Sequence, residues 1–196
     1  MWKINEIFHS LQGEGFNTGT ASVFIRLSGC NLHCGFCDTR HESGTMMSLP
    51  QVVEQVMRYP NAPLIVLTGG EPSLWIDETF VRGLKDMTGK RIAIETNGTH
   101  PLPNGIDWVT LSPKTGIGNS GDRPVILDRC DELKVVYLGQ DLTQYDNFSA
   151  DHRYLQPCWV DDPEQCRHNM QATVQAVLNH PEWKLSLQTH RILGIQ

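Results

Sequence analysis

Short apolar runs alternate with amphipathic stretches along most of the chain. Apolar residues in continuous or every-second positions predict strands, and apolar residues three and four positions apart predict helices. The predicted strands cover residues 3–8, 21–27, 63–68, 91–96, 108–112, 132–138, 153–156 and 184–188. The predicted helices cover residues 48–58, 77–87 and 163–180, and a capping box of Ser48 and Gln51 opens the first of them. This order of elements is typical of an α/β protein.

The apolar positions also predict which faces are buried. In the second strand Val23, Ile25 and Leu27 share one face, and residues 63–68 are mostly apolar, as in a strand covered on both sides. Two helices carry apolar stripes, formed by Phe80, Val81, Leu84 and Met87 and by Met170, Val174, Val177 and Leu178. The alternation of strands and helices predicts a mostly parallel sheet with outer helices.

Chain length limits the architecture further. The chain has 196 residues, whereas a complete eightfold barrel needs about 250. We therefore expect a single domain over residues 1–196, built as an incomplete barrel or an open curved sheet. Residues 116–121 are rich in glycine and are expected to form a surface loop.

Composition and charge exclude several classes of protein. Hydrophobic residues make up 39% and charged residues 19%, which argues against a disordered chain. No apolar run approaches the roughly 20 residues of a membrane-spanning helix, and the first residues lack a secretory pattern, so we expect a cytoplasmic protein. The 16 basic and 22 acidic residues give a formal net charge of −6, which argues against general affinity for nucleic acid.

Polar and glycine-rich segments follow four of the predicted strands. These segments are residues 29–30, 68–72, 95–99 and 112–114. Parallel α/β folds gather the carboxyl ends of their strands at one edge, where their active sites lie. The recurrence of such segments therefore predicts a functional site at this edge of the sheet.

Three of the six cysteines stand close together in the sequence. Cys30, Cys34 and Cys37 have the spacing Cys-x3-Cys-x2-Cys, which in a reducing compartment favours metal binding over disulfides. Three thiolates suit a four-iron cluster with one open iron, to which a substrate or cofactor can bind. Structural zinc, with His33 or His41 as a fourth ligand, and a thiol redox pair are the alternatives. The remaining cysteines are expected to be small buried residues: Cys130, Cys158 and Cys166.

Two further signals accompany the cysteine triplet. The aromatic Phe36 precedes the last cysteine, and Gly69-Gly70-Glu71-Pro72 follows the next strand. Together these motifs resemble the radical S-adenosylmethionine superfamily. The resemblance implies a [4Fe–4S] cluster whose open iron binds S-adenosylmethionine, and a 5'-deoxyadenosyl radical released by reductive cleavage. A Gly-Gly turn also lets the backbone come close to a ligand.

Further motifs, in order along nearly the whole chain, narrow the resemblance. They are Leu11-Gln12-Gly13-Glu14-Gly15, Phe24-Ile25-Arg26-Leu27, Cys37-Asp38-Thr39, Glu95-Thr96-Asn97-Gly98-Thr99, Ser112-Pro113-Lys114, Leu155-Gln156-Pro157 and Leu187-Gln188-Thr189-His190. This set resembles the 7-carboxy-7-deazaguanine synthase family. The resemblance implies conversion of 6-carboxy-5,6,7,8-tetrahydropterin to 7-carboxy-7-deazaguanine with loss of ammonia, in the synthesis of 7-deazapurines such as queuosine. It also implies Mg2+, a flavodoxin or ferredoxin as electron donor, and a homodimer.

The same resemblance assigns roles to individual residues. The cluster ligands would be Cys30, Cys34 and Cys37. The S-adenosylmethionine contacts would be Phe36, Cys37, Asp38, Gly70, Ser112, Pro113, Lys114 and Gln156. The substrate contacts would be Leu11, Gln12, Gly13, Arg26, Thr68, His190 and Gln196. Arg26 would pair with the substrate carboxylate and Thr39 would ligate Mg2+, while no residue is assigned as a catalytic acid or base.

Several of these residues also have an ordinary structural interpretation. Arg26 could be an ion-pair partner on a strand, Lys114 a surface charge, Thr39 a loop cap and His190 a buried structural histidine. The role of Glu14, a loop residue between glycines, stays open.

Two other functions remain possible from the sequence. An activase that installs a glycyl radical in a partner enzyme would share the cysteine triplet and a similar length. A non-catalytic module that binds zinc would use the same cysteines without iron. Gln12, Arg26 and His190 favour a small polar substrate over the activase, and iron and sulfide content separates an enzyme from the zinc module.

Overall fold

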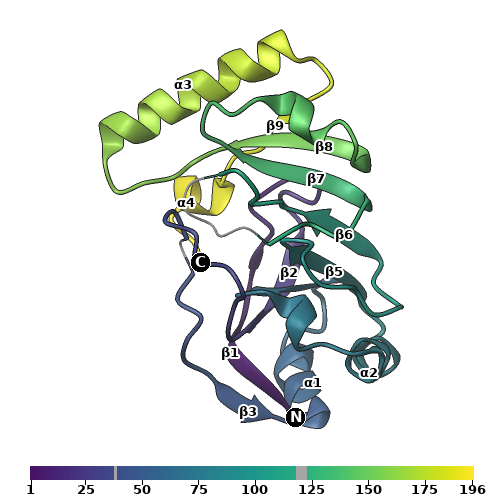
Figure 1. The fold of residues 1–196 in the computed structure, drawn as a ribbon. Coiled ribbons are helices and arrows are strands. Elements are labelled where there is room, and N and C mark those ends of the chain that lie inside the picture. Colours follow the sequence, from purple (N-terminus) through teal and green to yellow (C-terminus); the bar gives the residue numbers. More distant parts are fainter. Residues whose placement is uncertain (38, 118–122) are drawn as a thin grey trace.

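The computed structural model describes residues 1–37, 39–117 and 123–196, and within them one curved sheet of nine strands forms the core (Figure 1). The strands are β1 (Trp2–Leu11), β2 (Ala21–Leu27), β3 (Thr45–Met47), β4 (Leu64–Gly69), β5 (Arg91–Thr96), β6 (Trp108–Leu111), β7 (Arg129–Tyr137), β8 (Ser149–Pro157) and β9 (Lys184–Leu185). Their order in the sheet is β3-β1-β2-β4-β5-β6-β7-β8-β9. β1 is antiparallel to β2 and β3, and the neighbours from β2 to β9 are parallel.

Four α-helices accompany the sheet in the described residues. They are α1 (Leu49–Met57), α2 (Glu78–Thr88), α3 (Pro163–Asn179) and α4 (Thr189–Leu193), with short 3-10 turns at Pro72–Leu74 and Leu142–Tyr145. α1 begins at Ser48, whose backbone N–H donates to Gln51 Oε1 at 2.8 Å, as the capping box predicts. α2 begins at Asp77, which caps Phe80 N at 2.8 Å, and ends at Gly89 in the left-handed conformation.

The predicted α/β architecture is confirmed as an open, mostly parallel sheet with helices outside it. Each predicted strand and helix is present, although β9 covers only two of the five residues predicted for it. The sequence pattern did not predict β3 or α4, which are too short for a clear period. Of the predicted surface loop, residues 118–121 lie outside the described residues. No described helix has the length and apolar character needed to cross a membrane.

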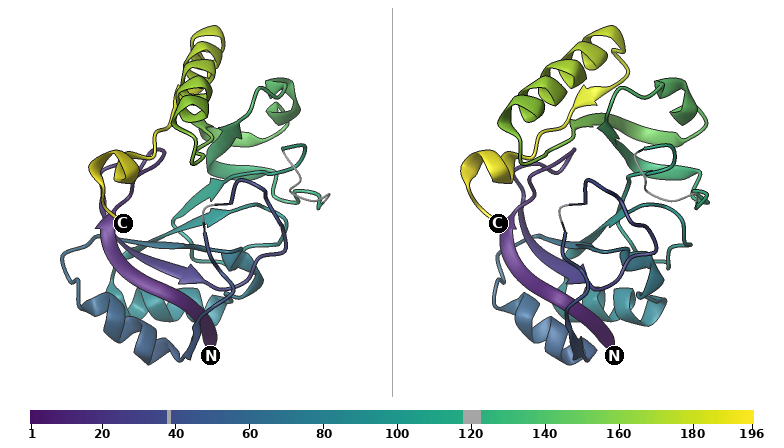
Figure 2. Two further views of the ribbon diagram at one scale, coloured as in Figure 1. Left: turned by 90° about the vertical axis from the view of Figure 1, so that its left-hand side faces the viewer. Right: turned by 60° about the vertical axis from the view of Figure 1, so that its left-hand side comes forward.

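The outer face of the sheet packs against α1 and α2, which lie side by side below it (Figure 2). The predicted face of β2 is confirmed, because Val23, Ile25 and Leu27 are completely buried there. The predicted stripe of α2 is correct for three of its four residues. Met87, in the last turn of α2, is the exception and is 50% exposed.

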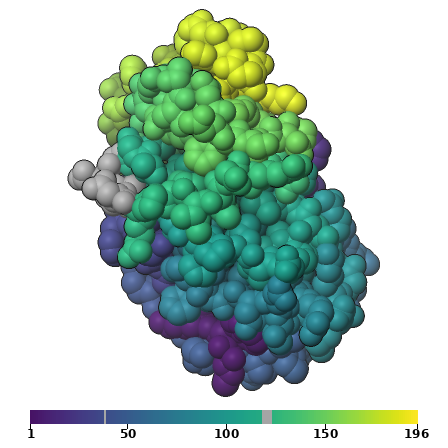
Figure 3. All heavy atoms as spheres, turned by 45° about the vertical axis from the view of Figure 1, so that its right-hand side comes forward, coloured from purple at the N-terminus to yellow at the C-terminus, as the bar shows by residue number. Residues whose placement is uncertain are grey.

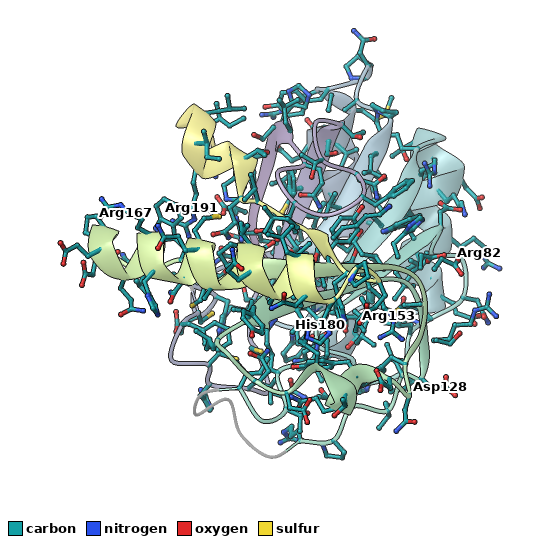
Figure 4. All side chains as sticks on the ribbon, turned by 90° about the horizontal axis from the view of Figure 1, so that it is seen from above. Arg82, Asp128, Arg153, Arg167, His180 and Arg191 are labelled. Atoms are coloured by element: carbon teal, nitrogen blue, oxygen red, sulfur yellow. The ribbon has the colours of Figure 1, made fainter. Side chains whose placement is uncertain are left out.

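α3 covers the other end of the outer face, over β8 and β9 (Figure 4). Its predicted apolar stripe is wrong in register. The buried residues are Asn169, Thr173 and Ala176, whereas Leu178 is 69% exposed. Polar side chains can be buried here because Asn169 Nδ2 donates to the carbonyl of Cys158 at 2.8 Å, and Thr173 Oγ1 to a carbonyl of the preceding turn.

The inner face of the sheet changes character along the strands. Near their amino ends, neighbouring strands place four apolar residues side by side: Phe24, Val66, Ala93 and Trp108. Two residues further along, Arg26 pairs with Thr68, and Thr110 lies between Glu95 and Glu132. Because side chains alternate between the two faces of a strand, this second row also points inward. The inner face therefore has an apolar layer below a polar one.

The open side of the sheet is bridged by two loops from opposite ends of the chain. The N–H of Gly15 donates to Ser186 Oγ at 3.0 Å, and the N–H of Thr189 donates to the carbonyl of Gly13 at 2.9 Å. These bonds join the loop after β1 to the segment after β9. Elsewhere the chain proceeds along the long axis of the molecule, with the first half mostly at one end and the last third at the other (Figure 3).

Candidate active site

A cavity of about 220 Å³ lies at the carboxyl edge of the sheet. Ten of the residues predicted for the site line it: Cys30, Cys34, Phe36, Cys37, Thr39, Thr68, Gly70, Ser112, Lys114 and Gln156. They come from the last residues of β4 and β8 and from the segments after β2, β4 and β6, so the strand ends meet as the parallel sheet requires. Asp38 lies outside the described residues, and Pro113 is buried beside the cavity without lining it.

The Gly-Gly turn after β4 fits against the backbone of the cysteine loop. A Cβ on Gly70 would stand 2.0 Å from the carbonyl oxygen of Gly29, so no larger residue fits without moving the loop. Two hydrogen bonds secure this contact, from Gly70 N to Leu27 O at 3.0 Å and from Glu71 N to Gly29 O at 2.9 Å. The glycines therefore place β4 directly against the residue that precedes Cys30.

Glu71 then connects this turn to the end of β5. Its carboxylate is 1% exposed and accepts bonds from Ser73 N at 3.1 Å, Thr96 Oγ1 at 2.7 Å and Asn97 N at 2.7 Å. Asn97 Nδ2 in turn donates to Asn31 Oδ1 at 3.1 Å, next to the first cysteine. Hydrogen bonds from Glu71 and Asn97 thus connect the cysteine loop to the ends of β4 and β5.

The three predicted cluster ligands share the cavity and are free thiols. Cys30 and Cys34 are half-buried and Cys37 is exposed, and burial raises the pKa of the Cys30 thiol. In the described part of the chain, no three His, Cys, Asp or Glu side chains converge as ligands of a single metal ion. Three thiols that line one cavity suit the ligation of an iron–sulfur cluster.

The other cysteines differ from this group in their surroundings. Cys130 is buried, and burial raises the pKa of its thiol to about 12, so it stays protonated. Cys166 is only half-buried, so the expectation of a buried residue is wrong for it: it lies at the start of α3, where its thiol donates to the carbonyl of Val160 at 2.9 Å. Cys158 is buried as predicted, but it also lines the cavity, which its isolated position in the sequence did not indicate.

Lys114 and Gln156 form another part of the wall of this cavity. Lys114 is half-buried and lines the cavity; desolvation lowers the pKa of its ammonium group, which donates a hydrogen bond to Ser112 Oγ. Gln156 is 6% exposed and accepts a bond from Ser186 Oγ at 2.9 Å. This wall thus presents one cation and several hydrogen-bonding groups to the cavity.

Arg26 lies in an adjoining cavity of about 390 Å³ that shares Thr39 with the first. Its Nε is 2.8 Å from a carboxylate oxygen of Glu6, and its Nη1 donates to Thr39 Oγ1 at 3.2 Å. The guanidinium also lies over the ring of Phe8, 5.3 Å from its centre. The ion pair that the sequence left as an alternative is therefore present, and it uses one edge of the guanidinium.

The remaining predicted substrate residues come together from both ends of the chain. Leu11 ends β1, and the ring of His190 packs so closely on Gly13 that a Cβ there would be 2.2 Å from Nδ1. Gln196 donates from Nε2 to Glu6 at 2.9 Å, which brings the last residue to the partner of Arg26. These residues lie beside the first cavity rather than among its lining residues.

A group of buried charges was missed by the sequence analysis. Lys134 Nζ donates to Glu14 Oε2 at 2.6 Å and to Glu95 Oε2 at 2.8 Å, and all three residues line the cavity. Burial alone would raise the pKa of Glu14, but Lys134 holds that pKa at about 2. The pKa of Glu95 is raised by burial, which Lys134 only partly offsets. These residues are far apart in sequence, and Lys134 stands out only as a charged residue between the apolar Leu133 and Val135.

Glu132 is a further buried acid, and we expect Glu132→Gln to remove a pH-dependent loss of stability. Burial raises the pKa of the Glu132 carboxyl from 4.5 to about 7, despite the opposing effect of Lys134. The folded state thus binds this proton more tightly than the unfolded chain, so stability falls as the pH rises between these values. The loss above pH 7 should be about 3 kcal/mol.

Urea unfolding of both proteins between about pH 4.5 and 8 measures this effect. Glutamine keeps an oxygen that can accept the bond from Phe16 N, which Glu132 Oε2 now accepts at 2.9 Å. A free energy of unfolding that changes equally with pH in both proteins would contradict the prediction.

Comparison with known proteins identifies the class. The family model described as "Radical SAM superfamily" matches residues 24–165. The chain is 53% identical over 196 residues to the 7-carboxy-7-deazaguanine synthase of Bacteroides thetaiotaomicron, with all of both chains covered. It is 37% identical to that of Bordetella pertussis, with 99% of each chain covered. The crystal structure of QueE from Escherichia coli matches with a TM-score of 0.75 and 27% identity, over 95% of this chain and 93% of that one.

The chain therefore belongs to the radical S-adenosylmethionine superfamily, as the cysteine loop predicted. Within it, the chain belongs to the 7-carboxy-7-deazaguanine synthase family, which confirms the narrower resemblance. Membership implies a [4Fe–4S] cluster and S-adenosylmethionine as cofactors, and a reductant. The full-length similarity favours this family over a glycyl-radical activase or a zinc-binding module.

Proposed function

We propose that this chain converts 6-carboxy-5,6,7,8-tetrahydropterin to 7-carboxy-7-deazaguanine with loss of ammonia. The observation that carries the proposal is one cavity lined by the cysteine triplet together with Lys114, Ser112 and Gln156. The 53% identity over the whole chain to a named synthase supports the same activity.

The residues that line this cavity would hold the cofactors. Cys30, Cys34 and Cys37 would ligate the cluster, and Phe36, Gly70, Ser112, Lys114 and Gln156 would contact S-adenosylmethionine. The desolvated ammonium of Lys114 suits the carboxylate of that cofactor, because an unpaired buried charge is costly. When bound, the cluster and S-adenosylmethionine supply the radical that takes a hydrogen atom from the substrate.

The residues on the open side would hold the substrate. Arg26 has one edge on Glu6 and a second edge that can grip a carboxylate with two donors. Thr68 lines the main cavity, and Gln12, Gly13 and His190 stand where the two bridging loops meet. These loops would exclude water from one side of the pterin.

Thr39 would be the magnesium ligand of the protein, since it lines both cavities. We expect Thr39→Ala to weaken the dependence of turnover on Mg2+ while cluster content and reductive cleavage of S-adenosylmethionine stay close to normal. A hydroxyl contributes modestly to a site that substrate and water oxygens complete. Titration of Mg2+ against product formation tests this, and an unchanged response would remove Thr39 from the site.

Anaerobic incubation with the carboxytetrahydropterin, S-adenosylmethionine, dithionite and Mg2+ tests the activity. Mass analysis should detect 7-carboxy-7-deazaguanine and unchanged amounts of S-adenosylmethionine, since the cofactor is regenerated. Cleavage of S-adenosylmethionine without any pterin product would contradict the proposal. A zinc content near one per chain, with no iron or sulfide, would also contradict it.

We further propose a homodimer in the cytoplasm that receives electrons from a flavodoxin or ferredoxin. The apolar side chains of Ile192 and Leu193 on α4 are 66% and 60% exposed, which supports a protein contact there. Sedimentation equilibrium tests the dimer, and reduction by each donor protein tests the electron source.

A further inference from the structure

Five polar side chains form one continuous hydrogen-bonded chain beside the cavity. Gln188 Nε2 donates to Glu14 Oε1 at 2.8 Å, and Glu14 Oε2 accepts from Lys134 at 2.6 Å. Lys134 also donates to Glu95 Oε2 at 2.8 Å, and Glu95 Oε1 accepts from Gln12 Nε2 at 3.1 Å. We call this set the Lys134 chain: Gln188, Glu14, Lys134, Glu95 and Gln12.

The Lys134 chain joins four segments that are otherwise far apart in sequence. Gln12 and Glu14 lie on the loop after β1, Glu95 is the penultimate residue of β5, Lys134 lies on β7, and Gln188 precedes α4. Two of these segments are the loops that bridge the open side of the sheet. The chain therefore attaches both bridging loops to the rigid parallel strands.

The charges in the chain are buried and depend on one another. The side chains of Lys134, Glu14 and Glu95 are 6%, 17% and 20% exposed. Each carboxylate bonds the central ammonium with one oxygen and a glutamine amide with the other. Without Lys134, the two carboxylates would lie in a region with little water and without their shared cation, which is strongly unfavourable.

The carboxylates also fix which way the two amides point. An ionised carboxylate only accepts hydrogen bonds, so the NH2 group of Gln12 must face Glu95 and that of Gln188 must face Glu14. The carbonyl oxygen of each amide then points away from its carboxylate. A tetrahydropterin carries several N–H donors on its rings, and amide oxygens are acceptors for such donors.

We propose that Lys134 is a positioning residue that, through Glu14 and Glu95, sets the amide orientation of Gln188 and Gln12 for a ligand edge rich in N–H groups. The proposal rests on the proposed function for the identity of that ligand. It assigns Gln188 to ligand recognition, and it gives Glu14 a structural purpose between two glycines.

The first test compares Lys134→Met, Lys134→Arg and the control Lys85→Met. Lys85 also donates to a carboxylate, Asp107 at 2.5 Å, but neither residue lines the cavity. We expect Lys134→Met to raise the KM for the carboxytetrahydropterin at least tenfold, with a smaller effect on the KM for S-adenosylmethionine. Lys134→Arg keeps the charge and should recover most of the loss, and Lys85→Met should behave as wild type.

Hydrogen exchange supplies a readout that does not depend on turnover. The N–H groups of Gln12, Gly15, Phe16 and Gly19 are all bonded within or across the loop after β1. We expect exchange at these amides to accelerate in Lys134→Met but not in Lys85→Met. Unchanged exchange together with an unchanged KM in Lys134→Met would overturn the proposal.

A second variant decides the matter if Lys134→Met does not fold. Gln188→Met removes the amide without leaving a charge unpaired. Gln165→Met, at the exposed start of α3, is its control, because the Gln165 amide donates to Asn169 and not to a carboxylate. The proposal requires a higher KM for the pterin in Gln188→Met and not in Gln165→Met, and an equal KM in both would overturn it. If wild-type protein makes no product from the pterin, the proposed function fails, and the exchange measurement alone then decides whether Lys134 positions the loop.

Discussion

Cys34→Ala is expected to abolish turnover and to lower the iron content after anaerobic reconstitution well below that of the wild type, as are Cys30→Ala and Cys37→Ala. Each variant removes one of three thiolates in the same cavity, and a cluster held by two thiolates lacks a defined open iron. Iron and sulfide per chain and the visible absorption spectrum measure the loss directly.

Cys166→Ala is the matched control, because its thiol bonds only to the backbone of Val160 in the described structure. It should keep its cluster and its activity, as should Cys130→Ala. Cys158→Ala is a less suitable control, since Cys158 lines the cavity although it was not predicted as a ligand. Full activity in Cys34→Ala, or loss of the cluster in a folded Cys166→Ala protein, would show that the ligands are misassigned.

Arg26→Ala is expected to weaken binding of the carboxypterin by about 10- to 100-fold while S-adenosylmethionine binds normally. Loss of a charge-assisted hydrogen bond costs about 1.5–3 kcal/mol, which corresponds to this range. Arg26→Lys keeps the charge but loses the planar pair of donors, so its affinity should lie between the two. Calorimetric titration of each ligand separately provides both affinities.

The ion pair with Glu6 makes the controls for Arg26 important. Glu6 is 39% exposed, so the carboxylate left without its partner can be hydrated and the fold should survive. Arg82→Ala, on the exposed surface of α2, controls for loss of positive charge. If both ligands bind more weakly to Arg26→Ala, then Arg26 supports the fold or the cysteine loop, and its role toward the substrate is wrong.

Periodicity was sufficient to predict the sheet, because its signals are local. The alternation at Val23, Ile25 and Leu27 and the apolar run in β4 each depend on neighbouring residues only. The carboxyl-edge site followed from the positions of Cys30, Gly70 and Lys114 after their strands. By contrast, the stripe of α3 was misplaced because Asn169 and Thr173 are buried through hydrogen bonds, which a hydrophobic pattern does not register.

The buried charges escaped prediction for a different reason. Glu14, Glu95 and Lys134 are separated by up to 120 residues, and each alone resembles an ordinary solvated charge. Their pairing arises only when β5 and β7 place them on the inner face and the loop after β1 crosses the open side. The ion pair between Arg26 and Glu6 joins neighbouring strands, yet the sequence alone did not identify Glu6 as the partner of Arg26.

The apolar layer of Phe24, Val66, Ala93 and Trp108 has a consequence for kinetics. A charged ligand that crossed this layer would lose its hydration against aromatic and aliphatic groups without gaining a partner. Exchange with solvent is therefore directed to the carboxyl edge, and two ligands must share that entrance. The ligand that binds deeper in the cavity must bind first and dissociate last. Steady-state kinetics should therefore show ordered binding. An excess of the outer ligand should slow dissociation of the inner one.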